Sequence, residues 1–132
     1  MLLTEETAAR VKKWHEGNGG HARCGPGPHA LRTMNEFVEF CLAAGCTPRQ
    51  ILNRVNTELH RQQNKGNVGG QFNPNEYIEE FADVRLCVEI MRAHGNINED
   101  VACNAKLLIL GTRDFEADPY GVLWRPGRSM GY

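Results

Sequence analysis

The chain has 132 residues, of which 41% are hydrophobic and 23% are charged; these values are typical of one soluble domain with its own core. Its formal net charge of −1 argues against a basic protein that recruits nucleic acid. No apolar run approaches the roughly 18–20 residues of a transmembrane helix, and the acidic N-terminus lacks the layout of a signal peptide. We therefore expect a cytoplasmic protein that binds neither nucleic acid nor membrane.

The N-terminal third predicts two helices separated by a loop. Thr4 precedes two glutamates, as a helix N-cap does, and the helix is expected to end near His15. Glycines and prolines over residues 17–28 predict a long loop, which in a small domain is often functional. Residues 29–44 then carry an apolar stripe at helical spacing, which predicts the second helix.

The middle of the chain predicts two more helices. Thr47-Pro48 is typical of a helix start, and this third helix is expected to fray in the polar run 61–65. A loop rich in glycine and asparagine follows. The fourth helix, about residues 74–94, has a seam of apolar side chains at alternating steps of four and three, which predicts a core-facing side. The seam comprises Tyr77, Phe81, Val84, Val88 and Met91.

The C-terminal part predicts a fifth helix that starts at Asn98, with Val101, Ala105 and Leu108 facing inward. Beyond it we expect an irregular tail over about residues 114–132, with at most a short extended piece at 122–124. The predicted fold class is therefore all-α, a bundle of about five helices in a single domain, 1–132.

Two acidic pairs with the same spacing are the most informative feature of the sequence. Glu36 and Glu39 lie in the second predicted helix, and Glu80 and Asp83 lie in the fourth. Residues three apart share a helix face, so two such helices packed together would bring four carboxylates close. Converging carboxylates repel one another, and Mg²⁺ prefers oxygen ligands. The alternative is two ordinary solvated faces, but no residue four positions after these acids is basic, whereas exposed acids usually alternate with bases.

Two segments resemble the signatures of the MazG-type all-α nucleoside triphosphate pyrophosphohydrolases. RTMNEFVEF at 32–40 is similar to the first signature, a basic residue followed by E-x-x-E and an apolar residue. EEFADV at 79–84 is similar to the second, E-E-[apolar]-A-D-[apolar], and is the most specific part. Residues 91–97 are similar to the end of the helix that precedes the family's last helix, and the tail from 106 to 124 is similar to small phage-encoded members. The resemblance covers most of the chain.

The resemblance implies an enzyme that cleaves a (deoxy)nucleoside triphosphate between the α and β phosphates, releasing a monophosphate and pyrophosphate. It implies Mg²⁺, with Mn²⁺ as a substitute, and a homodimer or homotetramer. The implied metal ligands and catalytic residues are Glu36, Glu39, Glu80 and Asp83. The substrate-binding candidates are Arg32, Lys106, Arg113 and Trp124; Lys106 and Arg113 are seven apart and would share a helix face, and Trp124 lies in a tail expected to carry little of the core.

Some positions depart from the family pattern. The stretch between the acidic pairs is longer than in compact members, which predicts an inserted helix and loop over about 46–74. Asn35 stands where many members have an acid, and Leu110 replaces an asparagine of the final helix. These departures keep two alternatives open: a helical accessory protein that binds a nucleotide or a partner without turnover, and a structural oligomer whose acids serve solubility.

Overall fold

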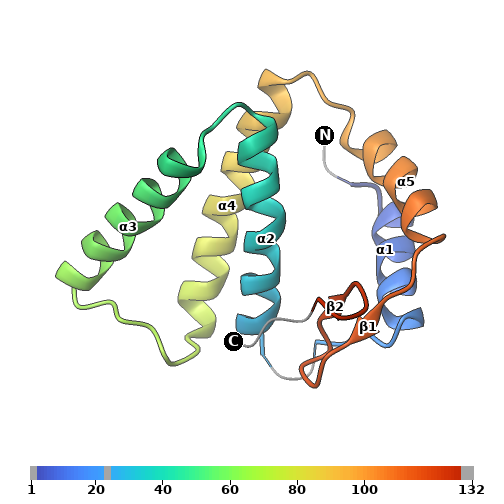
Figure 1. The fold of residues 1–132 in the computed structure, drawn as a ribbon, viewed down its shortest axis with the longest axis horizontal. Coiled ribbons are helices and arrows are strands. Elements are labelled where there is room, and N and C mark those ends of the chain that lie inside the picture. The colour runs from blue at the N-terminus through green and yellow to red at the C-terminus, as the bar shows by residue number, and fades with distance from the viewer. Residues whose placement is uncertain (1–2, 23–24, 129–132) are drawn as a thin grey trace. The chain divides into compact units, whose positions relative to one another are not determined.

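The computed structural model describes residues 3–22 and 25–128 (Figure 1). This part of the chain contains five helices and one small antiparallel sheet, which confirms the predicted all-α class. The helices are α1 (Glu5–Gly17), α2 (Gly27–Ala43), α3 (Pro48–Asn64), α4 (Pro74–His94) and α5 (Glu99–Leu110), and the strands are β1 (Glu116–Ala117) and β2 (Leu123–Trp124).

Four of the helices begin where a side-chain cap satisfies an otherwise free backbone N–H. Thr4 Oγ1 accepts from the N–H of Thr7 at 3.1 Å, and Thr47 and Gln50 form a reciprocal capping box. Asn73 and Asn98 cap α4 and α5 in the same way. Thr4, Thr47 and Asn98 were predicted as caps from the sequence, and the starts of α1, α3 and α5 agree with that prediction.

The expected fraying of α3 after Arg61 is wrong, because polar side chains hold its last turns together. Glu58 accepts hydrogen bonds from Arg61 Nε at 2.8 Å and from Gln62 Nε2 at 2.9 Å, and the helix continues to Asn64. The hydrogen bonds from Arg61 and then Gln62 lower the pKa of Glu58 to about 2. The polar run therefore extends the helix through pairs three and four residues apart.

Contacts within the chain divide it into two compact units. Of the described residues, the first unit combines 3–22 with 73–128 and so contains α1, α4, α5 and both strands; the second is residues 25–72, with α2 and α3. The insertion predicted over about 46–74 therefore folds together with α2, the helix that carries the first acidic pair.

The most deeply buried side chains of the described residues lie in the tail and on α1. Val122 is 1% exposed, Leu123 and Trp124 are 6% exposed, and Thr7 is 1% exposed. Strands β1 and β2 pair in the register Glu116 to Trp124. The tail was expected to carry little of the core, and this expectation is wrong.

One carboxylate fastens the turn between the two strands. Asp118 accepts from the backbone N–H of Tyr120 at 2.9 Å, from that of Val122 at 3.1 Å and from Trp124 Nε1 at 3.0 Å. Gly121 has φ +80°, and a Cβ there would lie 2.5 Å from the His21 ring. Only glycine fits this turn, because both the backbone conformation and the space exclude a side chain.

Polar contacts join α1 to α5 in the first unit, where the two helices lie side by side (Figure 1). Asn104 Nδ2 donates to Thr7 Oγ1 at 2.8 Å, and Thr4 Oγ1 donates to Asp100 Oδ1 at 3.0 Å. Hydrogen bonds from Thr7, and then from Thr4, lower the pKa of Asp100. This network satisfies the polar side chains of the contact and fixes the register of the two helices.

Several apolar stripes that were predicted as core are exposed. On α2, Leu31 is 50% exposed and Met34 is 47% exposed; on α5, Val101 is 61% exposed and Leu108 is 78% exposed. In the α5 sequence the inward face is instead the one with Cys103, Asn104 and Leu107, which are half-buried. Among the described residues no helix is both long and apolar enough to cross a membrane.

Candidate functional site

The acidic pairs lie on α2 and α4, as predicted, and all four carboxyl-bearing residues are exposed. Within each pair the three-residue spacing puts both side chains on one face of a regular helix. Glu36 and Glu39 belong to the second unit, and Glu80 and Asp83 belong to the first. Each pair is therefore a separate two-carboxylate surface on its own unit.

Glu36 has a cationic neighbour that the sequence argument overlooked. Arg32 Nη1 donates to Glu36 Oε1 at 3.0 Å, and the Arg32 side chain is 25% exposed. Arg32 lies four positions before Glu36, whereas the prediction rested on the residues four positions after each acid. Two residues predicted to hold metal and substrate thus bind each other in this structure.

The other three acids differ from Glu36. Glu39, Glu80 and Asp83 form no hydrogen bond and no ion pair with any described residue. Glu76 and Glu79 also lie on the first turns of α4, and their carboxylates have no partner in the described ranges either. The chain has no basic residue between Lys65 and Arg85, so the first half of α4 carries a concentrated negative charge.

Exposed apolar side chains accompany these acids on α4. Tyr77 is 44% exposed, Phe81 is 62% exposed and Val84 is 52% exposed. Residues three or four apart lie on neighbouring positions around a helix, so Glu80 lies beside Tyr77 and Val84. An acidic edge and an apolar seam therefore run along adjacent strips of the same helix.

The donor atoms of the acidic pairs suit a hard divalent cation. All are carboxylate oxygens, which Mg²⁺ and Mn²⁺ prefer, and no thiol or imidazole belongs to either pair. Among residues 3–22 and 25–128, no three or more His, Cys, Asp or Glu side chains are grouped so as to hold a metal ion. Each pair alone supplies two carboxylates, half of the four that were expected to converge.

The basic and aromatic candidates are placed differently from the expectation. Lys106 is exposed on α5, but α5 ends at Leu110, and the backbone N–H of Arg113 donates to the Leu110 carbonyl at 3.1 Å in the following turn. Lys106 and Arg113 therefore do not share a helix face, and that prediction is wrong. Trp124 is buried, so the reason for assigning it to substrate also fails.

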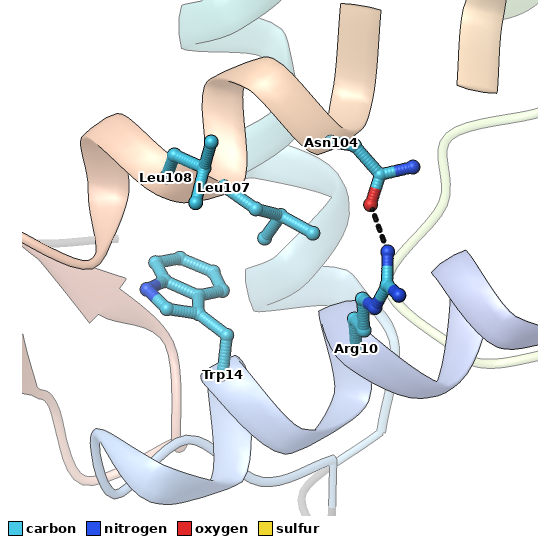
Figure 2. Close-up of a pocket in the computed structure, with 5 residues that line it drawn as sticks. All are labelled: Arg10, Trp14, Asn104, Leu107 and Leu108. Carbon is cyan, nitrogen blue, oxygen red and sulfur yellow. Dashed lines mark hydrogen bonds between the residues drawn. The ribbon is translucent and has the colours of Figure 1, made fainter. Parts of the chain in front are cut away.

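A pocket that the sequence argument did not anticipate lies between α1 and α5. Its volume is about 290 Å³, and its lining comprises Arg10, Trp14, Asn104, Leu107 and Leu108 (Figure 2). Arg10 and Trp14 are four apart on α1, and Asn104 and Leu108 are four apart on α5. That spacing could have shown the shared faces, but nothing in the sequence pairs these two helices.

Comparisons with known proteins add no relative: no family model, curated protein or solved structure matches the chain. The resemblance to the MazG-type pyrophosphohydrolases therefore rests on the sequence segments quoted above. For that reason the structural features of α2 and α4 must carry the functional argument.

Proposed function

We propose that this chain is a Mg²⁺-dependent nucleoside triphosphate pyrophosphohydrolase of the MazG type that acts as a homo-oligomer. The observation that carries the proposal is the set of exposed carboxylates on α2 and α4 without a partner in the described chain: Glu39, Glu80 and Asp83. An acid kept only for solubility is usually paired with a base on its own helix, and these three are not.

The apolar seam of α4 explains why assembly belongs in the proposal. Phe81 and Val84 are more than half exposed, and contiguous exposed apolar surface of this kind marks interaction sites. A second copy that covers the seam would remove water from the neighbouring Glu80 and Asp83. Desolvated carboxylates need a counter-cation, so covering the seam and binding Mg²⁺ favour each other.

In this proposal the residues have three roles: metal ligand, general base and phosphate contact. The candidate metal ligands are Glu80 and Asp83 on the first unit and Glu39 on the second; a bound ion would neutralise the triphosphate and lower the pKa of a coordinated water. Glu36, held by Arg32 in the free protein, is our candidate general base, because an acid that is not fully committed to metal can take a proton from water. Arg32, Lys106 and Arg113 are the candidate phosphate contacts, with Arg suited to bidentate binding.

The test is product analysis with the purified protein, Mg²⁺ and a panel of canonical and modified nucleoside triphosphates. We expect pyrophosphate rather than orthophosphate, lost when EDTA is added and in Glu80→Gln. Glu76→Gln is the matched control, because Glu76 also lies exposed on α4 but outside both signatures. Absence of pyrophosphate from every nucleotide with the folded protein would reject the proposal.

The Arg32–Glu36 ion pair favours a second candidate, a nucleotide-binding accessory protein without turnover. With Glu36 neutralised, the chain retains carboxylates that bind a Mg²⁺–nucleotide complex but lacks the proposed base. Calorimetry separates the two functions: saturable binding of a Mg²⁺–triphosphate with no product would support this candidate, and turnover would exclude it.

A further inference from the structure

The pocket between α1 and α5 has an apolar wall at one end and a polar group at the other (Figure 2). Its volume of about 290 Å³ is just below the range of about 300–1,000 Å³ for ligand pockets. It therefore suits a ligand of one small ring system rather than a whole cofactor. The pocket lies within the first unit, and its lining includes none of the acids on α2 or α4.

The apolar end is built from an indole and two leucines. Figure 2 shows Trp14 across the pocket from Leu107 and Leu108, and Leu108 is 78% exposed. Phe115 packs against Trp14 edge-on, with ring centroids 5.2 Å apart at 90°, an arrangement aromatic pairs prefer. The contact holds the indole in one orientation where it lines the pocket.

The polar end offers hydrogen-bond donors. Arg10 Nη1 donates to Asn104 Oδ1 at 2.7 Å and Nη2 donates to Glu6 Oε1 at 2.5 Å, while a guanidinium has five N–H donors. The Asn104 amide group donates to Thr7 and to the Asp100 carbonyl. The indole N–H of Trp14 is buried with no partner in the described chain and lies on the side of the ring away from Arg10. The donors left for a ligand at this end thus belong to Arg10.

The charge around Arg10 selects against anions. Glu6 is bonded to Arg10, and Arg10 also acts electrostatically on Asp100. Two carboxylates beside one guanidinium leave a net negative environment, which would repel a phosphate or carboxylate. A neutral group that accepts hydrogen bonds complements this end better than an anion does.

We infer that the pocket binds a neutral planar heteroaromatic ring, which stacks on Trp14 and accepts a hydrogen bond from Arg10. The base of a nucleoside and a nicotinamide ring both have this chemistry. Stacking on an aromatic side chain and one hydrogen bond give modest, millimolar affinity in a pocket this open. The inference does not rest on the proposed hydrolysis, because it uses neither Mg²⁺ nor the acidic pairs.

The test is titration of the full-length protein with neutral nucleosides and, separately, nicotinamide, followed by the NMR signals of the two indole N–H groups. The Trp14 signal is assigned with Trp14→Phe, since Trp124 supplies the only other indole. We expect a saturable shift of the Trp14 signal with little change at Trp124. Whether nucleosides or nicotinamide bind more tightly identifies the source of the ring.

Leu108→Lys should weaken binding about tenfold, since it places a flexible charge at the pocket mouth. Val101→Lys is the matched control on α5, because Val101 is 61% exposed and does not line the pocket; its affinity should stay unchanged. Arg10→Gln, on a side chain 54% exposed, is a second variant that should weaken binding, because it removes the proposed donor. Three results would each overturn the inference: no shift at millimolar ligand, equal binding by Leu108→Lys and the native protein, or tighter binding of nucleoside monophosphates than of nucleosides.

Discussion

The two halves of α4 have the same helical geometry but opposite surroundings. In the first half Phe81 and Val84 of the apolar seam are 62% and 52% exposed, and the acids have no partner among the described residues. In the second half Val88 and Met91 of the same seam are half-buried, and the charged side chains beside them form ion pairs. Arg85 binds Glu89 at 3.4 Å and Glu99 at 3.2 Å, and Arg92 binds Glu89 at 2.8 Å.

The comparison shows that the acids of the first half do not stabilise the helix through ion pairs. The second half shows how this chain stabilises a helix: it alternates acids with arginines and ties α4 to the start of α5. Glu80 and Asp83 lack such a device, so their contribution to the stability of the isolated chain is small. Residues kept without a structural role are candidates for function, and the predictions below separate the two halves by experiment.

The largest expected difference between the halves is in activity. Glu80→Gln and Asp83→Asn should each lower kcat for pyrophosphate release by about 100-fold or more, because each removes a negative oxygen ligand. Glu89→Gln, in the second half, should stay within about threefold of the native rate. Steady-state kinetics at saturating Mg²⁺ make the comparison. Equal losses in all three variants would mean that the halves do not differ in function.

The next effect concerns assembly through the exposed seam. Phe81→Lys should raise the concentration needed for half-association by about tenfold or more, since a buried aromatic at an interface commonly contributes about 2 kcal/mol. Leu86→Lys is the control: Leu86 is 63% exposed but lies on another side of α4. Sedimentation velocity over a concentration series measures both. A native protein that stays monomeric throughout would refute the proposed homo-oligomer.

A smaller effect should appear in the stability of the second half. Arg85→Ala removes the ion pair to Glu99, in which both side chains are less than a quarter exposed, and should lower the free energy of unfolding by about 1 kcal/mol. The loss is limited because Arg85 Nη1 is already buried without a hydrogen bond among the described residues, which costs free energy in the native chain. Urea denaturation of Arg85→Ala beside Glu76→Gln, expected to be near neutral, checks this.

Local signals explain how much of the fold could be predicted from the sequence. The capping residues Thr4, Thr47 and Asn98 act within one helical turn, so they predicted three helix starts without knowledge of the tertiary structure. The fraying expected after Arg61 was wrong because pairs three and four residues apart on α3 were not weighed. The overlooked Arg32–Glu36 contact has the same origin, because only one direction along the helix was considered.

Packing between distant segments could not be predicted in the same way. The burial of Trp124 depends on a turn in which Asp118 takes three hydrogen bonds and on the fit of Gly121 against His21, and neither has a periodic pattern. The pocket at Trp14 requires the pairing of α1 with α5, nearly a hundred residues apart. The acidic pairs were found because their spacing is local; whether four carboxylates converge depends on contacts that no local pattern encodes.

The smallest expected effect is the pH dependence of the paired half of α4. The hydrogen bond from Arg92 lowers the pKa of Glu89 from 4.5 to about 2. A carboxyl with a depressed folded-state pKa contributes stability that is fully present above its unfolded pKa and is lost as the pH falls toward the folded value. The native chain should therefore lose this contribution between about pH 4.5 and pH 2, and Glu89→Gln should be slightly less stable than the native chain at neutral pH and converge with it near pH 2.

Urea denaturation at several pH values measures the difference, which should be small because surface pairs contribute little. A constant offset between the two proteins across this range would show that the Arg92–Glu89 contact does not couple protonation to folding, and the structural role assigned to the second half would then rest on Arg85 alone.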